Sequence, residues 1–463
     1  MASSGGPGVP GHRSPHKGKE EMTKKTERPV GGGLIAEGKT KIIFAAKQDP
    51  GKVLLVSKDD ITAGDGAKHD LIEGKAELAT QTTCNVFRLL KACGIPVAFD
   101  EQIDATTFLA PLCQMLPYEV VVRREAHGSY LKRMPFLAKG HLFPKLLVEL
   151  YLKTSGKKWK EHSLLCDDPL MEYSQGAGTI SLYLPSKPIH GQVPFLVLPE
   201  SEVFGSAEEW KLFPEIKKIA GRAFLILEKA WQLEGRTLVD YKVEFGLARD
   251  GALLLADVID NDSWRVLENG IHIDKQAYRD GGQLDDVAGK YRRVAEVTGR
   301  FRLPVQQVLI WRGSDKDDVS PLVNAIDRFC GGAACSEGRR LKLTTATCSL
   351  HKEPVRGLNE LHCYVQQVPD TVVIAFIGRS NGAGPTLSAS TTVPVITVPA
   401  SFKEFPDDVW SSLRTPSNVP VTTVLEPSNA ALAALEILAL RNPQLYMFLR
   451  EQVEERLANL ILI

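Results

Sequence analysis

The sequence predicts two domains of different fold class, an α+β domain with an antiparallel sheet and then an α/β domain with a doubly wound parallel sheet. The chain has 463 residues, too many for one ordinary domain and suitable for two or three. Up to about residue 300, β-rich segments are grouped, with helices between and after them, as in α+β folds. From residue 303 onward, strand-like and helical segments alternate strictly, which indicates a parallel sheet. We therefore expect a tail over 1–30, a first domain over 31–302 and a second over 303–463.

Residues 1–30 are rich in Gly, Ser, Pro and Lys and offer almost nothing to bury, which predicts a disordered tail. The alternative is an amphipathic targeting peptide. It is disfavoured because the segment contains three glutamates and has no apolar face.

The overall composition is that of a globular protein, with 43% hydrophobic and 24% charged residues. Its formal net charge of zero argues against a generalised nucleic-acid or anionic-membrane surface, and no apolar run has the length of a membrane span. The eight cysteines form no CxxC pair and no zinc-like spacing. With no secretory signal in view, we expect reduced thiols and a cytoplasmic protein that acts on small molecules, without nucleic-acid or membrane partners.

Two helices are expected in the first domain. Residues 71–93 carry apolar side chains at helical spacing and are followed by Gly94, a common helix stop; a second helix is expected from about 207 to 231. Residues 166–205 contain many Pro and Gly and are expected to be rich in loops. The strand-like segments are 53–57, 118–122, 147–152, 238–245 and 252–258.

In the second domain each expected strand is followed by a loop and a helix. The strands are expected at 305–310, 341–347, 371–377, 393–398 and 421–425. The helices are expected from residue 319 and over 353–365, 407–413 and 430–440. A last amphipathic helix, over 444–460, is a candidate for packing on another subunit because its apolar stripe has no evident use in a monomer.

The segment TLVDYKVEFG (237–246) carries the strongest chemical signal in the first domain. On a strand, Asp240, Lys242 and Glu244 lie at i, i+2 and i+4 and share one face. After a turn at 249–251, Asp257 ends the next strand. Two carboxylates on adjacent strands with lysines nearby suit magnesium and a nucleoside triphosphate, whereas the alternative is a solvated strand face. Asp260, Asp262 and Arg265 would then recognise a substrate.

Two further segments of the first domain suggest anion binding. EGKTK (37–41) combines a glycine, which permits close approach of a phosphate, with two lysines; an ordinary surface turn is the alternative, as it is for AGDG (63–66). PYEVVVRREAHGS (117–129) predicts a buried strand that delivers two arginines before Gly-Ser opens a short helix. His127 in this segment is expected to be structural.

Three loops of the second domain follow strands and are expected at one sheet edge, at 313–317, 348–352 and 377–385. Ligands of open α/β sheets bind at that carboxyl edge, where helix N-termini suit a phosphate. Each loop alone is an ordinary βα turn, but together the three predict a pocket.

The first domain resembles the SAICAR synthetase (phosphoribosylaminoimidazole-succinocarboxamide synthase) family over about residues 33–300. The resemblance rests on EGKTK, TAGDGA, EVVVRREAHGS, LVDYKVEFG, LADVIDNDSWR and DKQAYRD (274–280), in this order. It implies an ATP-grasp-like fold and a carboxylate–amine ligase that joins L-aspartate to the carboxylate of CAIR with ATP and Mg²⁺.

By matching positions, the resemblance implies particular roles. Lys39 and Lys41 would contact the ATP phosphates, Glu244 and Asp257 would bind ATP and hold the magnesium, and Asp240 and Lys242 would be catalytic. The residues implied to hold the substrate nucleotide are Arg123, Ser129, Asp262 and Arg265. One departure is that the chain reads KTSG (153–156) where the family often has KDD, with CDDP (166–169) following later.

The second domain resembles the AIR carboxylase family of the animal kind, with a flavodoxin-like fold, over about residues 304–463. The specific matches are GRSNGAGP (378–385) and DVWSSLR (408–414). The resemblance implies a carboxy-lyase that adds CO₂ to the C4 carbon of AIR (phosphoribosylaminoimidazole) without ATP, biotin or metal. His351 would transfer the proton, a role that suits histidine near neutral pH.

The remaining residues of this implied site would bind substrate. Those that would hold the ribose phosphate are Ser314, Asp317, Ser349 and Lys352, and those placed on the CO₂ side are Ser380 and Asn381, next to Arg379. Two departures are Leu350, where the family usually has Ala, and the Trp311-Arg312 pair. Leu350 is expected to crowd the pocket beside His351.

Together the domains resemble bifunctional animal enzymes of purine synthesis, in which the carboxylase product CAIR is the synthetase substrate. The resemblance implies a homo-octamer. Two alternatives remain at the level of sequence: an active synthetase whose second domain serves only for oligomerisation, and a nucleotide-sensing scaffold with both sites inactive. Glu244, Asp257 and Lys242 argue against the scaffold, and His351 argues against the pure oligomerisation module.

Overall fold

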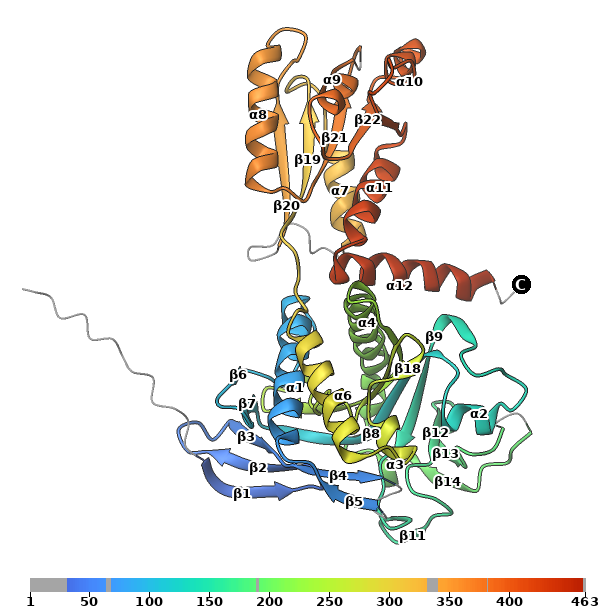
Figure 1. The fold of residues 1–463 in the computed structure, drawn as a ribbon. Coiled ribbons are helices and arrows are strands. Elements are labelled where there is room, and N and C mark those ends of the chain that lie inside the picture. Colours follow the sequence, from blue (N-terminus) through green and yellow to red (C-terminus); the bar gives the residue numbers. More distant parts are fainter. Residues whose placement is uncertain (1–30, 64–67, 189–190, 331–339, 381, 461–463) are drawn as a thin grey trace, which may run out of the picture.

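The computed structural model describes residues 31–63, 68–188, 191–330, 340–380 and 382–460. Figure 1 shows two bodies, with the second domain standing on one end of the first and the last helix lying between them. The expected tail over 1–30, most of TAGDGA (64–67) and the candidate site residue Asn381 lie outside the described residues.

The first domain contains two antiparallel sheets. The smaller has the order β1-β2-β3-β7-β6, and every neighbouring pair in it is antiparallel. Its strands are β1 (Gly31–Glu37), β2 (Lys41–Ala46), β3 (Lys52–Ser57), β7 (Thr107–Pro111) and β6 (Glu101–Gln102). A separate hairpin follows β3, formed by β4 (Asp60–Ala63) and β5 (Lys68–Leu71).

The larger sheet has nine strands in the order β14-β13-β12-β9-β8-β15-β17-β18, with β16 paired to β15. Its central strands are β9 (Leu142–Leu152), β8 (Cys113–Glu125), β15 (Thr237–Ala248), β16 (Leu253–Leu255), β17 (Trp264–Glu268) and β18 (Ile271–His272). All of these pairings are antiparallel, so the α+β prediction is confirmed. A small hairpin of β10 (Lys158–Trp159) and β11 (His162–Ser163) lies outside this sheet.

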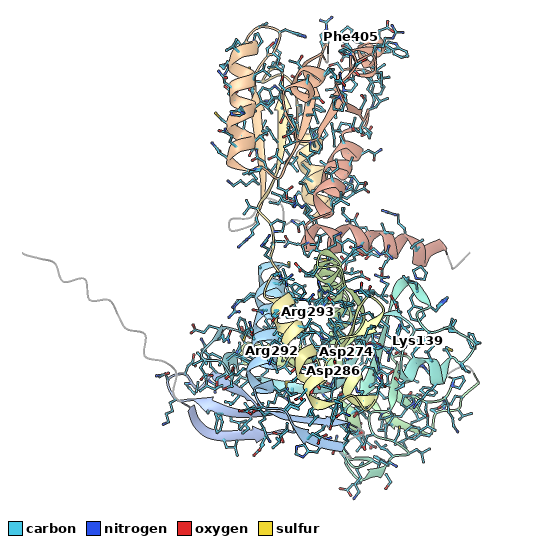
Figure 2. All side chains as sticks on the ribbon, in the orientation of Figure 1. Lys139, Asp274, Asp286, Arg292, Arg293 and Phe405 are labelled. Carbon is cyan, nitrogen blue, oxygen red and sulfur yellow. The ribbon has the colours of Figure 1, made fainter. Side chains whose placement is uncertain are left out.

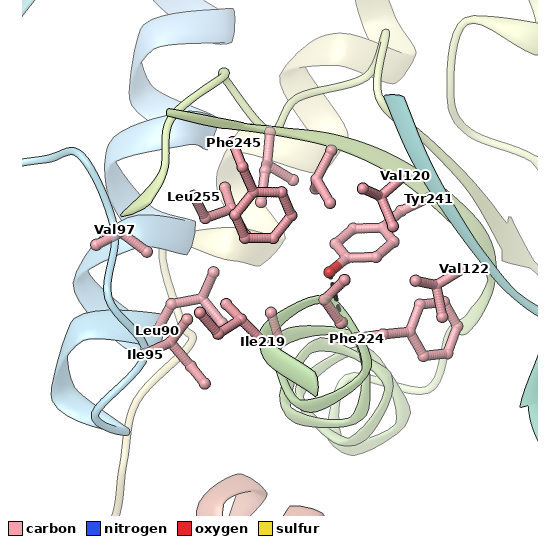
Figure 3. Packing of buried hydrophobic residues seen from close by; sticks show 14 of the residues in the cluster. Leu90, Ile95, Val97, Val120, Val122, Ile219, Phe224, Tyr241, Phe245 and Leu255 are labelled. Carbon is pink, nitrogen blue, oxygen red and sulfur yellow. Dashed lines mark hydrogen bonds between the residues drawn. The ribbon is translucent and has the colours of Figure 1, made fainter. Parts of the chain in front are cut away.

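Helices α1 (Lys75–Ala92), α4 (Leu212–Leu233) and α6 (Leu284–Thr298) accompany the sheets, together with the short α2 (Ser129–Arg133), α3 (Glu200–Val203) and α5 (Gln276–Arg279). Figure 3 shows the core where Phe224 of α4 and Leu90 of α1 meet Phe245 and Tyr241 of β15. Tyr241 is buried, and its hydroxyl donates to the carbonyl of Ala220 in α4 at 2.7 Å. Apolar side chains of β15 therefore fill the core on one face, which leaves its polar face for chemistry.

One expectation for the first domain was wrong, and two features of it were not foreseen. The helix expected over 71–93 begins at Lys75, because residue 71 pairs in the β4–β5 hairpin and Gly74 has φ of +79°. The segment 166–205 is rich in loops as expected, but it also contributes β12 (Leu170–Ser174), β13 (Thr179–Tyr183) and β14 (Leu196–Pro199) to the larger sheet, which was not foreseen. Helix α6 was not predicted at all.

The second domain is a five-stranded parallel sheet of order β20-β19-β21-β22-β23, which confirms the doubly wound prediction. The strands are β19 (Gln306–Arg312), β20 (Leu341–Thr347), β21 (Thr371–Ile377), β22 (Val395–Pro399) and β23 (Thr422–Thr423). Helices α7 (Ser320–Phe329) and α11 (Pro427–Ala439) pack on one face, and α8 (Pro354–Gln367) and α9 (Ala383–Ala389) on the other. A 3₁₀ helix (Pro406–Val409) leads into α10 (Trp410–Leu413).

The last helix, α12 (Pro443–Leu460), does not stand free for another subunit as expected. It lies across the end of α4, and the buried Met447 joins the core of the first domain. The apolar stripe that the sequence shows is therefore used within the chain. No helix among the described residues is long and apolar enough to cross a membrane. No disulfide joins the cysteines of these ranges.

Candidate active sites

Three charged residues lie side by side across the centre of the larger sheet. Asp240 of β15 is in register with Arg123 of β8 on one side and Arg265 of β17 on the other. Asp240 Oδ2 accepts from Arg123 at 2.8 Å and from Arg265 at 2.7 Å. Glu149 on β9 also accepts from the Nε of Arg123 at 2.9 Å. The row leaves each arginine with donors beyond the Asp240 contact, which suits a bound carboxylate or phosphate.

Asp240 is 3% exposed, and removing it would leave two arginines without their shared partner. Breaking a buried ion pair from one side costs about 3–5 kcal/mol. Asp240 is therefore a structural member of the site as well as a candidate catalytic residue.

Two and four residues further along β15, Lys242 and Glu244 extend this polar face as the sequence predicts. Lys242 Nζ donates to Glu119 Oε1 at 2.8 Å and to Glu244 Oε1 at 3.1 Å. Glu244 is 3% exposed, and Lys153 donates to its other oxygen. The interpretation as a solvated strand face is wrong, because two of the three residues are buried.

The charges of this cluster hold one another ionised. Burial alone would lower the pKa of Lys242, but Glu119 and Glu244 raise it well above the ordinary lysine value. Burial would likewise raise the pKa of Glu244, but Lys242 and Lys153 lower it below the usual range. Glu244 is therefore a carboxylate at neutral pH, as a magnesium ligand must be.

Lys41 brings the EGKTK segment to the same cluster. Its ammonium group pairs with Asp257, which lies just after β16. Burial, which outweighs the attraction of Glu244, lowers the pKa of Lys41 to about 8. Lys41 thus pairs with one of the two carboxylates that the sequence suggested for the metal and is within electrostatic reach of the other. Lys39 is exposed, and none of the contacts within the described residues joins it to this cluster.

The described residues contain no group of three or more His, Cys, Asp or Glu side chains that could hold a metal by themselves. Glu244 and Asp257 still fit Mg²⁺, because magnesium is usually bound by one or two carboxylates together with substrate phosphates. Three lysines around the pair supply the positive charge that such phosphates require.

Asp262 belongs to a separate cluster and does not contact Arg265. It accepts from Lys275 at 2.9 Å and from Tyr291 at 2.5 Å. Burial would raise the pKa of Asp262, but Lys75 and Lys275 lower it. Burial and the neighbouring Asp262 raise the pKa of Asp260.

The loop between β8 and α2 lies over the arginine row. A Cβ on Gly128 would lie 2.4 Å from Arg265, and φ at Gly128 is +58°, so only glycine fits this approach. Ser129 follows it on the surface. His127 is 3% exposed and pairs with Glu125 at 3.2 Å, in keeping with a structural role.

Sequence reasoning missed Lys153, Lys75, Glu119 and Tyr291 as members of these clusters. The signal for Lys153 was present, because it begins the KTSG segment. That segment meets CDDP in space, since Thr154 and Asp168 exchange hydrogen bonds of 2.8 and 2.9 Å. Nothing local in the sequence distinguishes the other three from ordinary surface or core residues.

In the second domain, the loops that follow β19 and β21 meet at the switch point of the sheet. Asp317 Oδ2 accepts from the backbone N–H groups of Gly313 and Ser314, both at 3.0 Å, and its other oxygen lies against Gly378. Asp317 therefore shapes the loop. The hydroxyl of Ser314 accepts from the backbone N–H of Lys316 at 3.3 Å.

The loop that follows β20 brings His351 to the same edge of the sheet. His351 is exposed, and its Nε2 lies 3.5 Å from the position that a Cβ would take on Gly382, just before α9. Ser349 is half-buried and Lys352 is exposed beside it. The three loops therefore converge as the sequence predicts.

Leu350 does not crowd this pocket, contrary to expectation. It is 6% exposed and packs with Trp311 and Cys348 beneath α8. A Cβ on Gly357 of α8 would lie 2.3 Å from Leu350, so the absence of a side chain there makes room for it.

Arg379 and Ser380 lie on the loop that follows β21. The guanidinium of Arg379 lies 4.2 Å from the ring centroid of Phe405, and the N–H of Ser380 donates to Asp408 at 3.1 Å. Figure 2 labels Phe405 at the end of the second domain that points away from the first domain. Asp274 is labelled within the first domain. The two candidate sites of one chain are thus far apart in the fold.

Comparison with known proteins assigns both domains. The family model described as SAICAR synthetase matches residues 34–165 and 198–297, and the model described as AIR carboxylase matches 308–458. A multifunctional protein of Caenorhabditis elegans is 36% identical over 435 residues, covering 91% of this chain and 93% of that protein. The bifunctional phosphoribosylaminoimidazole carboxylase/phosphoribosylaminoimidazole succinocarboxamide synthetase of Homo sapiens is 36% identical over 440 residues, 91% of this chain and 93% of that protein.

A phosphoribosylaminoimidazole-succinocarboxamide synthase of Chloroflexus aurantiacus is 40% identical over 278 residues, which cover 58% of this chain and 97% of that protein. The resemblance noted for each domain is therefore confirmed, and the full-length matches contain both domains together. This chain belongs to the bifunctional AIR carboxylase and SAICAR synthetase family of purine biosynthesis, which combines a lyase domain with a ligase domain.

Proposed function

We propose that the chain carboxylates AIR with CO₂ to give CAIR at the second domain, and joins L-aspartate to CAIR with ATP at the first domain to give SAICAR. The observation that carries the ligase assignment is the buried charged face of β15, where a row of Arg123, Asp240 and Arg265 adjoins the Glu244–Asp257 pair. One end suits the anionic groups of CAIR, and the other suits a magnesium-bound triphosphate.

In the ligation, we assign to the lysines the stabilisation of the negative charge on the phosphoryl group that is transferred. The CAIR carboxylate is activated by phosphoryl transfer, and the amine of aspartate then displaces the phosphate. Lys41, Lys153 and Lys242 converge on the carboxylate pair and would stabilise the transferring phosphoryl group. Glu244 and Asp257 would hold the magnesium, which would supply positive charge against the nucleotide phosphates. Lys39, exposed at the turn, would reach the nucleotide only once it is bound.

In the carboxylation, His351 would hold and then move the proton at C4 of AIR. Its exposed position at the sheet edge leaves its ring accessible to substrate. Ser314, Ser349 and Lys352 would hold the ribose phosphate, and Asp317 would keep the first loop in shape. Arg379 and Ser380, with Asn381, would line the side from which CO₂ enters. No ATP, biotin or metal is required by this assignment.

Both activities are tested by assaying each half-reaction separately on the purified full chain. We expect CAIR formation from AIR and bicarbonate without ATP, and SAICAR formation from supplied CAIR, aspartate and ATP. Ligation without carboxylation would favour the oligomerisation-module alternative. The buried position of Leu350 favours an active carboxylase, since its side chain packs beneath α8 while His351 is exposed. We also infer a cytoplasmic location, a compartment in which cysteines without CxxC or zinc-like spacing are expected to stay reduced.

The tight approach of Gly128 to Arg265 makes a specific prediction. Gly128→Ala should raise the KM for CAIR about 10- to 100-fold, because a Cβ displaces the Arg265 guanidinium by about an ångström or more. Gly235→Ala is the matched control, since Gly235 also has a positive φ, of +73°, but has nothing within 4 Å of the added Cβ. Steady-state ligation kinetics check this. Equal KM values in the two variants would show that Arg265 does not bind CAIR.

We also propose that the chain assembles as a homo-octamer through its second domain. The resemblance to AIR carboxylases supports this, and so do exposed apolar residues on that domain: Val355 is 74%, Trp410 46% and Leu413 53% exposed. Light scattering at micromolar concentration should give a mass near eight times the 50.8 kDa of one chain. A mass of one chain would contradict the proposal.

A further inference from the structure

Helix α12 is built from the last described residues of the chain, yet most of its polar contacts are with the first domain. Gln444 Nε2 donates to the carbonyl of Cys93 at 3.0 Å, and the hydroxyl of Tyr446 donates to Glu228 of α4 at 2.9 Å. Glu451 accepts from Arg222 of α4 at 2.7 Å. The helix therefore packs on the first domain, although all strands of the parallel sheet lie between the two in the sequence.

Further contacts of α12 reach β8 and β9, two strands that carry residues of the ligase site. The β8–β9 ladder pairs Arg123 with Leu147 but Glu125 with Leu142, so residues 143–146 of β9 bulge opposite Arg124. A bulge leaves backbone groups without ladder partners. Phe143 and Leu146 of this bulge are half-buried, and backbone groups shielded from water are satisfied from elsewhere.

Helix α12 supplies two of those partners. Leu146 N donates to Glu454 Oε2 at 2.8 Å, and Arg450 donates to the carbonyl of Pro144 at 2.8 Å. The carbonyl of Phe143 accepts from Arg124 at 3.0 Å. The bulge is thus held from both sides, by Arg124 within the sheet and by α12 above it.

Arg124 itself depends on the helix. It is 5% exposed, its Nε donates to Glu228 Oε1 at 2.6 Å and its NH2 donates to Glu454 Oε1 at 2.6 Å. Glu454, also 5% exposed, therefore binds Arg124 with one oxygen and the bulge with the other. Arg123, the residue before Arg124, points to the opposite face of the strand, where it pairs with Asp240.

We propose that Glu454 is a positioning residue for the ligase site: through Arg124 and the bulge of β9, it fixes the end of the β8–β9 hairpin that presents Arg123 and the Gly128–Ser129 loop to CAIR. The inference rests on the proposed ligation of aspartate to CAIR. It makes the last helix of the carboxylase segment part of the synthetase site, so that ligation depends on a helix that follows the parallel sheet in the sequence.

The test compares Glu454→Gln with Glu451→Gln in the full chain. Both replace an acid of α12 that pairs with an arginine of the first domain, but Glu451 contacts only α4 and not the bulge. We expect Glu454→Gln to raise the KM for CAIR about 10-fold, within the range for residues that act through others, with the KM for ATP and the rate of AIR carboxylation unchanged. Glu451→Gln should leave all three unchanged.

Two results would overturn the proposal: the same kinetics in both variants, or a proportional loss of ligation and carboxylation with both KM values unchanged, which would show that α12 only stabilises the fold. If Glu454→Gln yields no soluble protein, Arg450→Gln repeats the test at a half-exposed position, with an expected rise in the KM for CAIR of about threefold. An unchanged KM for CAIR in that variant would count against the proposal. The parent chain is assayed first, because failure of the parent to ligate supplied CAIR contradicts the proposed function and not this inference.

Discussion

Glu244→Gln should lower the rate of aspartate ligation by about 10²–10³-fold and leave AIR carboxylation at the parental rate. The substitution keeps the size of the side chain but removes the charge that Lys242 and Lys153 hold ionised. A preorganised charge aimed at a developing one is worth about this much in rate. Asp257→Asn should act in the same direction, because Asp257 pairs with Lys41 at the same place. The measurement is SAICAR formation from supplied CAIR, aspartate and magnesium-ATP.

The matched control is Glu209→Gln. Glu209 is also a buried acid of the first domain, but it binds the hydroxyl of Tyr118 and the N–H of Gly205 away from the charged face. The Glu209→Gln variant should be less stable than the parent but should show no specific loss of the rate of aspartate ligation. Raising the magnesium concentration should partly restore the Glu244→Gln variant if the carboxylate helps to hold the metal. Parental ligation rates in both Glu244→Gln and Asp257→Asn would show that the pair does not serve the metal nucleotide.

The second domain was predictable because its signals are local. Strand β21 is a fully buried and largely apolar run, and β20 is rich in Thr and alternates Leu with Lys, so both were placed without error and α8 to within two residues. The first domain was less predictable. Strands such as β12 and β13 have mixed polarity and lie between Pro and Gly residues, so their place in the sheet depends on pairing with β9 and β14, across loops of more than ten residues.

The same contrast holds for the sites. The period of a strand alone places Asp240, Lys242 and Glu244 on one face, and that prediction is confirmed. Lys75 could not be predicted, because only the packing of α1 beside α6 and the 255–265 segment brings it near Asp262. The amphipathic pattern of α12 gave its apolar stripe but not its partner. A stripe reports that a surface is covered, and only the three-dimensional structure shows that α4 of the same chain covers it.

His351→Asn should lower AIR carboxylation by about 10²–10⁴-fold, the usual worth of a general acid–base group, while ligation of aspartate to supplied CAIR stays near normal. Asparagine keeps some hydrogen bonding but cannot exchange a proton near neutral pH, as histidine can. The two half-reactions are measured on the same sample, so intact ligation shows that the loss is confined to the carboxylase. Because the assigned carboxylation uses no ATP, its rate in the parent should also be indifferent to ATP and to chelation of magnesium.

The matched control is His362→Asn, since His362 is an exposed histidine of the same domain that pairs only with Gln366 of its own helix at 2.8 Å. It should carboxylate at the parental rate. A parental rate in His351→Asn as well would make His351 a structural residue and move the proton transfer to another group at the sheet edge. No carboxylation in the parent itself would favour the oligomerisation module. Crowding by Leu350 would not explain that result, because its side chain lies under α8 and away from His351.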